Sequence, residues 1–443
     1  MNRYLEGNYA PVTQEVTATD LPVTGNLPDW LEGRYLRNGP NPMAADPATY
    51  HWFTGDGMVH GIRLRGGRAD WYRNRWVRNE TVANALGEEW KGGPVFGGFD
   101  FAANTNVIGH AGRTFAIVEA GSRPYELTDD LDTIGVCDFD GTLPGGYTAH
   151  PKRDPETGEL HAVSYYFGWG NKVQYSVIAP DGRVRRTVDI EVGASPMLHD
   201  MSLTERFAVI YDLPVVFQMD AAMEGNTFPY AWDPDYQARI GLLPREGDAD
   251  DVRWFEVEPC YVFHPLNAYD DGDRVVLDVV RHPRMFDKNR LGPDEGKPTL
   301  DRWTVDLTAG KVLEERLDDR GQEFPRVDER LVGRRHRYGY ASGVVEGEDK
   351  HLDFGSNALL KHDLVAGSTA VREFRSGAGG EFVMAPSAPD AGEDEGVLVG
   401  LVYDRERDAS DLVVLDAATL DDVATVHLPA RVPYGFHGNW VPA

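Results

Sequence analysis

The sequence is poor in cysteine. Its 443 residues include two, Cys137 and Cys260, which lie far apart in the chain. Two separated thiols cannot form the disulfide framework of a small secreted domain, and they do not supply a cysteine zinc motif. We therefore expect both cysteines to be buried thiols in a reducing compartment.

Long apolar runs are also missing. No stretch approaches the ~20 consecutive apolar residues that a membrane-spanning helix requires. The first residues, MNRYLEGNYAPVTQEV, lack the apolar core of a signal peptide. These features predict a cytoplasmic protein, whose contact with a membrane, if any, would be peripheral.

Positive charge is in deficit, with 44 Lys and Arg against 72 Asp and Glu and a formal net charge of −28. Surfaces that bind nucleic acid or anionic lipid are basic, so this balance argues against both classes of partner. The hydrophobic fraction of 41% is instead typical of a folded chain that buries a large core.

Helical periodicity is scarce, and short alternating runs separated by turn residues recur instead, as in FHPLNAYDDGDRVVLDVV. Six or seven such strand–turn–strand clusters predict an all-β fold, either a β-propeller or stacked sandwiches. Because no linker interrupts them, we expect one closed domain over residues 1–443. The last inner strand would lie within 434–440 and close the ring. Short helices are expected at 28–33 and within 217–243.

Residues 213–247 break the strand rhythm. They carry Met219, Met223 and Phe228 in a loop-like context. We expect this segment to form part of a loop and helix cap over one face of the propeller, beside the opening to its interior.

Four of the thirteen histidines share a local setting, near a strand start and before Pro, Asp or Gly. They are His150, His199, His264 and His437. They lie in four different strand clusters, and inner strands of separate blades converge on a propeller axis. The four imidazoles can therefore meet without any local spacing motif.

Four neutral imidazoles suit Fe, Cu, Zn or Ni. Such ligands leave the metal charge uncancelled, so buried carboxylates should accept the other ring N–H of each histidine. Glu119 closes an apolar strand, and Glu323 and Glu381 each precede a phenylalanine. The alternative is that these are ordinary solvated glutamates.

Histidines elsewhere more often have structural roles, so His51, His60, His110 and His161 are left out of the metal set. His60 is expected to form a hydrogen bond within the first blade. His110 lies in the turn-like sequence GHAGR and is expected to be exposed.

The sequence resembles the carotenoid cleavage oxygenases, a family that includes apocarotenoid oxygenases, stilbene-cleaving dioxygenases and the vertebrate retinoid isomerase. The matching segments follow in chain order: EGRYLRNGPNP, HWFTGDGMVHGI, NTNVIGHAGRTFAIVEAGSRPYEL, TAHPKRDPETGELHAVSYYF, HDMSLTERFAVIYDLP, FHPLNAYDDGD, EFPRVDER and GFHGNW. The set covers nearly the whole chain and is far more specific than any one motif.

The resemblance implies a seven-bladed propeller with non-haem Fe(II) on its axis. His150, His199, His264 and His437 are similar to the family's iron ligands, and Glu119, Glu323 and Glu381 to the glutamates that hold them, which leaves one histidine without a carboxylate. Thr105 matches a small residue whose methyl group crowds one open iron position. Phe53 and Phe263 are expected to line an apolar tunnel, with plain core packing as the alternative.

The implied reaction is cleavage of a conjugated C=C bond by O2, which gives two carbonyl products. Val118 stands where the stilbene-cleaving branch typically has a lysine that binds the phenol oxygen. We therefore expect an apolar polyene, a carotenoid or apocarotenoid, rather than a stilbene. A retinoid-type isomerase and a non-catalytic carrier of apolar ligands are less favoured alternatives.

An apolar substrate of this kind raises the question of whether the protein contacts a membrane. Val215, Val216, Phe217, Met223 and Phe228 would form either an apolar patch that docks weakly on a bilayer or part of the packing on the propeller face. The oligomeric state is not indicated by any feature of the sequence.

Overall fold

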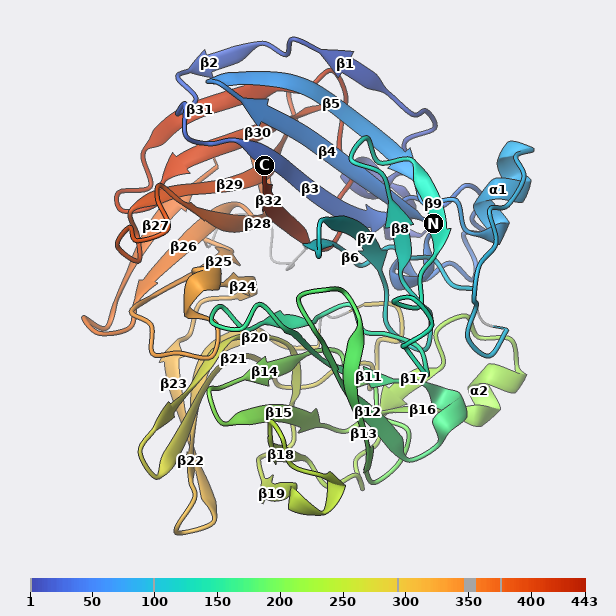
Figure 1. Cartoon of the computed structure of the whole chain (residues 1–443), viewed down its shortest axis with the longest axis vertical. Coiled ribbons are helices and arrows are strands. Elements are labelled where there is room, and N and C mark those ends of the chain that lie inside the picture. The colour runs from blue at the N-terminus through green and yellow to red at the C-terminus, as the bar shows by residue number, and fades with distance from the viewer. Residues whose placement is uncertain (1, 99, 293–294, 346–355, 375–376) are drawn as a thin grey trace.

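The computed structural model describes residues 2–98, 100–292, 295–345, 356–374 and 377–443. Seven antiparallel sheets surround a central axis (Figure 1), and the inner strands of neighbouring sheets contact one another. The protein is a seven-bladed β-propeller, so the predicted fold class is confirmed.

The strands of each blade follow from the axis outward. Blade I contains β32 (Gly438–Pro442), β3 (Gly33–Pro40), β4 (Gly57–Arg65), β5 (Arg68–Trp76) and β1 (Thr17–Thr19). Blade II contains β6 (Asn106–His110), β7 (Arg113–Ile117), β8 (Tyr125–Leu127) and β9 (Thr133–Val136). Blade III contains β10 (Lys152–Arg153), β11 (Leu160–Tyr165), β12 (Lys172–Ile178) and β13 (Val184–Glu191). Blade IV contains β14 (Met201–Leu203), β15 (Phe207–Asp212), β18 (Arg239–Pro244) and β19 (Arg253–Glu256).

The remaining blades follow the same order. Blade V contains β20 (Tyr261–Asp271), β21 (Arg274–His282), β22 (Thr299–Asp306) and β23 (Lys311–Asp318). Blade VI contains β24 (Gln322–Arg326), β25 (Tyr338–Gly343), β26 (Ala358–Asp363) and β27 (Ser368–Glu373). Blade VII contains β28 (Gly377–Pro386), β29 (Gly396–Asp404), β30 (Ala409–Asp416), β31 (Asp422–His427) and β2 (Val23–Gly25).

Both ends of the chain take part in closing the ring. The last strand, β32, pairs with β3 and is the innermost strand of blade I, while β1 and β2 cover the outer edges of blades I and VII. Strand pairing at these edges uses N–H and C=O groups that would otherwise be open. The predicted closing strand is therefore present, although it begins at Gly438 rather than at residue 434.

The cap segment is an insertion between β15 and β18 of blade IV. It contains β16 (Val215–Phe217), helix α2 (Met219–Met223) and β17 (Tyr230–Trp232), and β16 pairs with β17. The helix expected within 217–243 is thus present. The insertion ends before β18, so the last part of 213–247 belongs to the blade rather than to the cap.

Two expectations about helices were incomplete or wrong. Residues 28–33 form a turn that leads into β3 rather than a helix. Six residues form few intrahelical hydrogen bonds, so a segment this short needs tertiary support to become helical. Helix α1 (Glu80–Leu86) was not anticipated, although Asn79 accepts the Val82 N–H as its N-cap.

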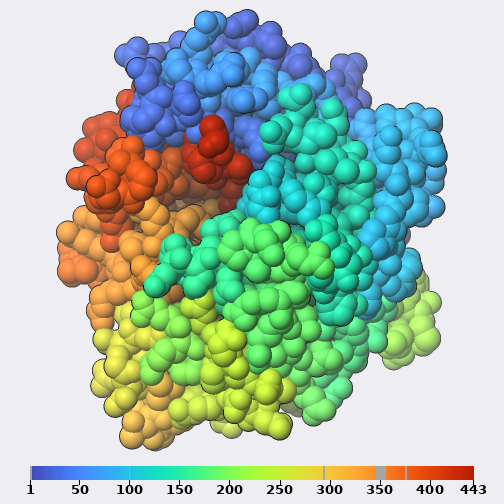
Figure 2. Space-filling model, viewed as in Figure 1, coloured from blue at the N-terminus to red at the C-terminus, as the bar shows by residue number. Residues whose placement is uncertain are grey.

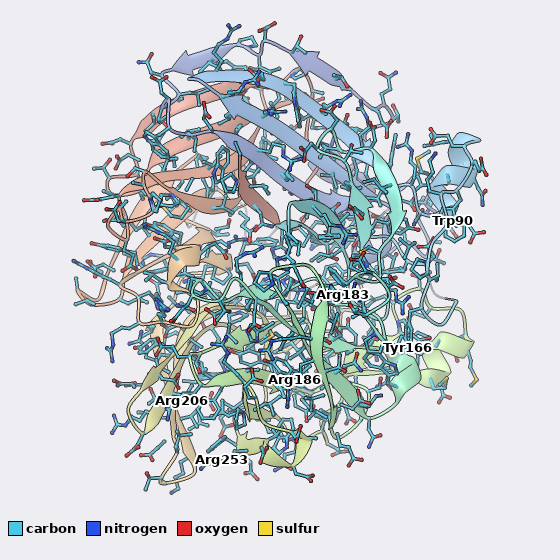
Figure 3. All side chains as sticks on the ribbon, in the orientation of Figure 1. Trp90, Tyr166, Arg183, Arg186, Arg206 and Arg253 are labelled. Atoms are coloured by element: carbon cyan, nitrogen blue, oxygen red, sulfur yellow. The ribbon has the colours of Figure 1, made fainter. Side chains whose placement is uncertain are left out.

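Arginines connect neighbouring blades across the lower half of the ring (Figure 3). Arg186 of blade III pairs with Asp248, Arg206 of blade IV pairs with Asp270 at 2.9 Å, and Arg253 donates to the carbonyl of Leu307. These interactions between neighbouring blades fix how the blades are positioned around the central axis.

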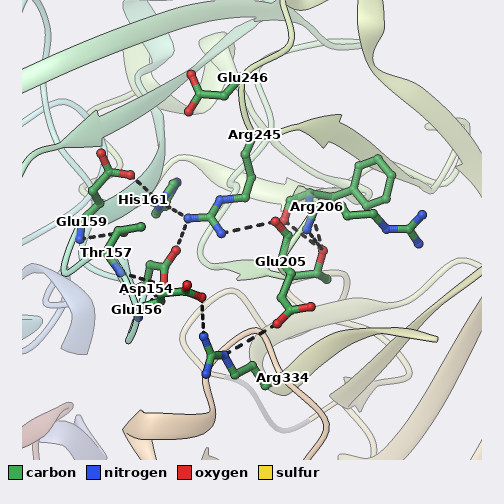
Figure 4. Close-up of polar contacts among 12 residues, drawn as sticks. Asp154, Glu156, Thr157, Glu159, His161, Glu205, Arg206, Arg245, Glu246 and Arg334 are labelled. Atoms are coloured by element: carbon green, nitrogen blue, oxygen red, sulfur yellow. Dashed lines mark hydrogen bonds and ion pairs between the residues drawn. The ribbon is translucent and has the colours of Figure 1, made fainter. Parts of the chain in front are cut away.

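A second polar cluster joins blades III, IV and VI (Figure 4). Arg245 pairs with Asp154 and lies 2.9 Å from Nε2 of His161, while Arg334 pairs with Glu156 at 2.8 Å. The Arg245 guanidinium holds the pKa of Asp154 at about 2, although burial acts in the opposite direction. The cluster therefore stays ionised at neutral pH.

Two glycines meet where the ring closes. A Cβ on Gly435 would lie 2.8 Å from Cα of Gly39, and a Cβ on Gly39 would lie 2.7 Å from Cα of Gly435. Real Cβ atoms do not approach backbone this closely, so the chain before β32 can pass β3 only if both residues are glycine.

Substituting Gly435→Ala should force these backbones apart and lower the free energy of unfolding by about 1–3 kcal/mol, the usual range for overpacking. The midpoint of thermal unfolding measures the effect. Gly380→Ala is the matched control, because its Cβ would meet a single atom at 3.8 Å. Equal midpoints for the two variants would contradict tight closure at this point.

Candidate metal centre

Each of the seven inner strands brings one predicted site residue to the axis, either within the strand or up to two residues before it. From blade I to blade VII these residues are His437, Thr105, His150, His199, His264, Glu323 and Glu381. In β20, β24 and β28 the strand register shifts at this residue. Such β-bulges redirect side chains, which is a common feature next to functional sites.

The four predicted histidines form one buried cluster. Each offers a ring nitrogen, and these nitrogens all lie within 4.8 Å of one another. The ring centroid of His150 is 4.4 Å from that of His199 and 4.6 Å from that of His437. Four separate blades thus supply a compact set of nitrogen donors.

Glutamates orient three of these rings through Nδ1. The Nδ1 atom of His199 lies 2.8 Å from Glu119 and that of His264 lies 2.6 Å from Glu323. The Nδ1 atom of His437 lies 3.0 Å from Glu381. Since a carboxylate accepts hydrogen bonds, each Nδ1 carries the proton and each Nε2 is left with a free lone pair.

The arrangement of the Nε2 atoms fits a bound cation. Nε2 of His199 and Nε2 of His264 face each other at 3.2 Å, and Nε2 of His150 is buried without a hydrogen-bond partner. Two lone pairs at this distance repel unless a cation lies between or beside them. The donor set is all nitrogen and neutral, which suits a first-row transition metal.

Burial and the neighbouring charges set the protonation states of the site. Burial lowers the pKa of His264 to about 3, and burial with the neighbouring histidines lowers the pKa of His150 well below its usual value. Burial is the largest effect on the pKa of His199 and acts to lower it, but the charge and hydrogen bond of Glu119, together with the charges of Asp200 and Glu323, outweigh burial and raise the pKa. The site therefore favours a positive charge at its centre while keeping most rings neutral.

The glutamates are kept ionised by their own partners. Burial would raise the pKa of Glu381, yet Arg326 and His437 hold it at about 2. His264 and His282 likewise lower the pKa of Glu323 against the effect of burial. Arg326 lies 3.3 Å from Glu381, and Nε2 of His282 lies 2.7 Å from Glu323.

His282 and Arg326 are site residues that the sequence did not reveal. His282 ends β21 and lies outside the segments that carry the family resemblance, whereas Arg326 ends β24 and lies within EFPRVDER but was not singled out there. Both reach the centre only through tertiary packing.

The histidines left outside the metal set have structural roles. His60 accepts or donates a hydrogen bond with the Tyr72 hydroxyl at 3.0 Å within blade I, as expected. The expectation for His110 was wrong, because it is buried. Its ring contacts the Ala179 carbonyl at 2.8 Å and Arg153 at 3.0 Å. A turn next to another blade is covered by that blade, which sequence alone does not show.

His51 and His161 are also buried. His51 stacks on Phe228 with ring centroids 4.1 Å apart, and Nδ1 of His161 lies 2.6 Å from the Tyr175 hydroxyl. Neither ring belongs to the axial cluster.

Two cavities with different linings reach the cluster. The larger, about 830 Å³, runs along the axis on the side of the C-terminus, where Figure 2 shows the surface hollowed. Its lining includes many charged residues together with His150, His264 and His437. The smaller, about 310 Å³, lies under the cap and is mostly apolar, and it reaches His199, His264 and His437. The histidines thus stand between a channel of mixed lining that includes many charged residues and an apolar chamber.

The predicted tunnel residues lie in the apolar chamber. Phe53 and Phe263 both line it, as do Thr105, Val118 and Glu119. The rings of Phe53 and Phe263 meet edge to face with centroids 5.9 Å apart. Their contact with a substrate stays a prediction.

This combination of fold and site defines a class of metal-dependent β-propeller enzymes. The family model of the retinal pigment epithelial membrane protein matches residues 9–442. The chain belongs to this family, the carotenoid cleavage oxygenases, and it is an oxidoreductase of the dioxygenase type.

Individual relatives cover almost the whole chain. The carotenoid cleavage oxygenase of Mycobacterium tuberculosis is 53% identical, over 100% of this chain and 98% of the relative. The carotenoid 9,10(9',10')-cleavage dioxygenase 1 of Phaseolus vulgaris is 34% identical, over 99% and 89%.

Solved structures agree with this assignment. The lignostilbene dioxygenase of Pseudomonas brassicacearum is 28% identical with a TM-score of 0.90, over 99% of this chain and 98% of that one. The cobalt-substituted apocarotenoid oxygenase of Synechocystis is 27% identical with a TM-score of 0.87, over 98% and 97%.

None of the helices among the described residues has both the length and the apolar character needed to cross a bilayer.

Replacing Glu323 by Gln should weaken metal binding by about 10–100-fold, the usual effect of losing the partner of a metal-binding histidine. The amide is a weaker acceptor for Nδ1–H of His264 and carries no charge to balance the metal. Titration of the metal-free protein with Co2+, followed by visible absorption, measures the affinity. Glu126→Gln is the control, because Glu126 pairs with Arg113 away from the cluster. Unchanged affinity in Glu323→Gln would contradict this role.

Proposed function

We propose that the whole chain acts as one Fe(II)-dependent dioxygenase domain that cleaves a conjugated C=C bond of a carotenoid or apocarotenoid with O2, giving two carbonyl products. The observation that supports this most is the buried four-histidine cluster at the floor of an apolar chamber. Hydrolysis would need polar groups around the scissile bond, and the chamber offers few.

His150, His199, His264 and His437 would hold the iron. When bound, Fe(II) with open coordination positions supplies the activation of O2 and the oxidative chemistry. Glu119, Glu323 and Glu381 hold the rings in the tautomer that presents Nε2. Thr105 precedes β6 at the matching position of blade II and borders the chamber, where its small side chain would limit access to one side of the centre.

The chamber lining favours a polyene. Val118, Phe101 and Phe263 contribute apolar surface, and an extended conjugated chain needs no hydrogen-bond donor to bind there. Apolar walls also exclude water from the reacting bond. No side chain in the chamber is required to transfer a proton. The shape of the chamber wall would determine which C=C bond of the substrate is cleaved.

A stilbene is the second candidate, because the lignostilbene dioxygenase has a closely similar fold. A phenol oxygen needs a polar partner when it is buried. Val118 is 2% exposed and presents a branched alkyl group, so it cannot serve as one. The retinoid-type isomerase and the non-catalytic carrier stay as alternatives that consume no O2.

The first experiment is anaerobic reconstitution with Fe(II), followed by O2 uptake and product mass with β-carotene, an 8′-apocarotenal and resveratrol. We expect O2 consumption and aldehyde products from a polyene. His437→Ala should lose iron loading or activity while keeping most of the fold, because it removes one of four ligands. Iron binding without O2 consumption would favour the isomerase or the carrier, and cleavage of resveratrol alone would overturn the substrate assignment.

The cap is also where a membrane-derived substrate would enter. Met219 and Met223 of α2 are 60% and 74% exposed, and Met219, Phe217 and Phe228 border the chamber. Val215 and Val216 are buried, so the apolar patch is smaller than expected. We propose that α2 makes weak contact with a bilayer.

The double substitution Met219→Asp and Met223→Asp should reduce cosedimentation with phosphatidylcholine vesicles severalfold, because it places charge where α2 would meet acyl chains. Binding of the unaltered protein should not fall at high salt, since the contact is hydrophobic. Leu313→Asp, on the exposed outer strand of blade V, is the control. Equal binding by all three proteins would exclude α2 as the contact.

A further inference from the structure

His150 differs from the other three axial histidines because no glutamate among the described residues holds its Nδ1 atom. Nδ1 of His150 lies 3.8 Å from Oδ2 of Asp200, which is longer than a hydrogen bond. Both side chains are buried, at 4% and 3% exposure, and both border the axial cavity. A polar contact at this separation is often completed by one water.

Asp200 is itself fixed from two directions. Its Oδ1 atom accepts the backbone N–H of Met201 at 2.6 Å, and Nζ of Lys152 lies 2.8 Å from Oδ1 and 2.9 Å from Oδ2. A buried carboxylate held by three contacts has little freedom to turn. Its position relative to His150 is therefore set by the fold.

The chain positions of Lys152 and Asp200 also link this ion pair to the axial histidines. Lys152 begins β10 two residues after His150, and Asp200 lies between His199 and the start of β14. The ion pair thus joins the starts of two neighbouring inner strands, each of which delivers one histidine to the axis.

We propose that Asp200, held by Lys152, is the fourth positioning carboxylate of the centre. It accepts the Nδ1–H of His150 through one water of the axial cavity, and so presents Nε2 of His150 to the metal. This inference rests on the proposed metal-dependent function.

Lys152 balances the charge of Asp200, as Arg326 balances that of Glu381. Glu119 and Glu323, which contact histidines, already place two negative charges around a divalent site. A further unpaired carboxylate would add an uncompensated buried charge, which is strongly unfavourable. Pairing with Lys152 supplies a hydrogen-bond acceptor while adding no net charge.

A plain brace between blades is the competing explanation, and metal binding separates the two. Metal-free full-length protein is titrated anaerobically with Co2+, and the visible absorption is recorded. Asp200→Asn should bind Co2+ about 10–100-fold more weakly, the range seen when such partners are lost, with an altered spectrum. Asp212→Asn is the control, because Asp212 is an equally buried carboxylate of blade IV that pairs with Arg239 away from the histidines.

The double variant Lys152→Met, Asp200→Asn separates positioning from charge. It has the same net charge as the ion pair, so a general electrostatic effect on the metal cancels, whereas the weakening of the hydrogen bond to His150 does not. If near-ultraviolet circular dichroism shows that Asp200→Asn alone loses its tertiary structure, the double variant is used for the test instead.

We expect the double variant to show the same weakened affinity and altered spectrum as Asp200→Asn, with Asp212→Asn unchanged in both. Unaltered affinity and spectrum in the double variant would overturn the assignment of Asp200 while leaving the proposed function intact. Failure of the unaltered protein to bind Co2+ or Fe(II) would instead overturn the proposed function, and this inference with it.

Discussion

The hydrogen bond between a histidine Nδ1–H and a buried carboxylate is the interaction on which the centre depends. Neutral imidazoles leave the charge of a divalent ion uncancelled, and a buried ion needs counter-charge close by. The glutamates that supply this counter-charge lie on different blades from the histidines to which they are hydrogen-bonded. Glu323 of blade VI serves His264 of blade V, and Glu381 of blade VII serves His437 of blade I.

Because donor and acceptor lie on different blades, the centre requires one register of the whole ring. Strand β32 fixes this register at the point of closure, where it pairs with β3 immediately after His437. The backbone N–H of His437 also donates to the Thr105 carbonyl at 3.1 Å, which ties blade I to blade II. Closure of the fold and assembly of the site are therefore the same event, and a chain that failed to close would lack a ligand.

The sequence predicted the parts of this site that carry a local signal. His150, His199, His264 and His437 stand near strand starts in separate clusters, and alternation with turns predicted the β-rich fold. Residues without such a signal were missed. His282 and Arg326 act only through carboxylates that lie far away in sequence, and His110 is buried by a neighbouring blade rather than by its own turn. The seven-blade count itself came from family resemblance, since strand patterns do not specify how many sheets close a ring.

The fold does not select the substrate, because folds of this kind host more than one reaction. The lignostilbene dioxygenase and the apocarotenoid oxygenase both match this chain closely in structure. Selection must therefore come from the side chains that form the chamber walls. Val118 contributes a buried alkyl group to the wall beside Glu119, so its side chain offers no hydrogen-bond partner to a phenol placed there. A polyene has no phenol group to desolvate, so an apolar wall at this position is compatible with a polyene.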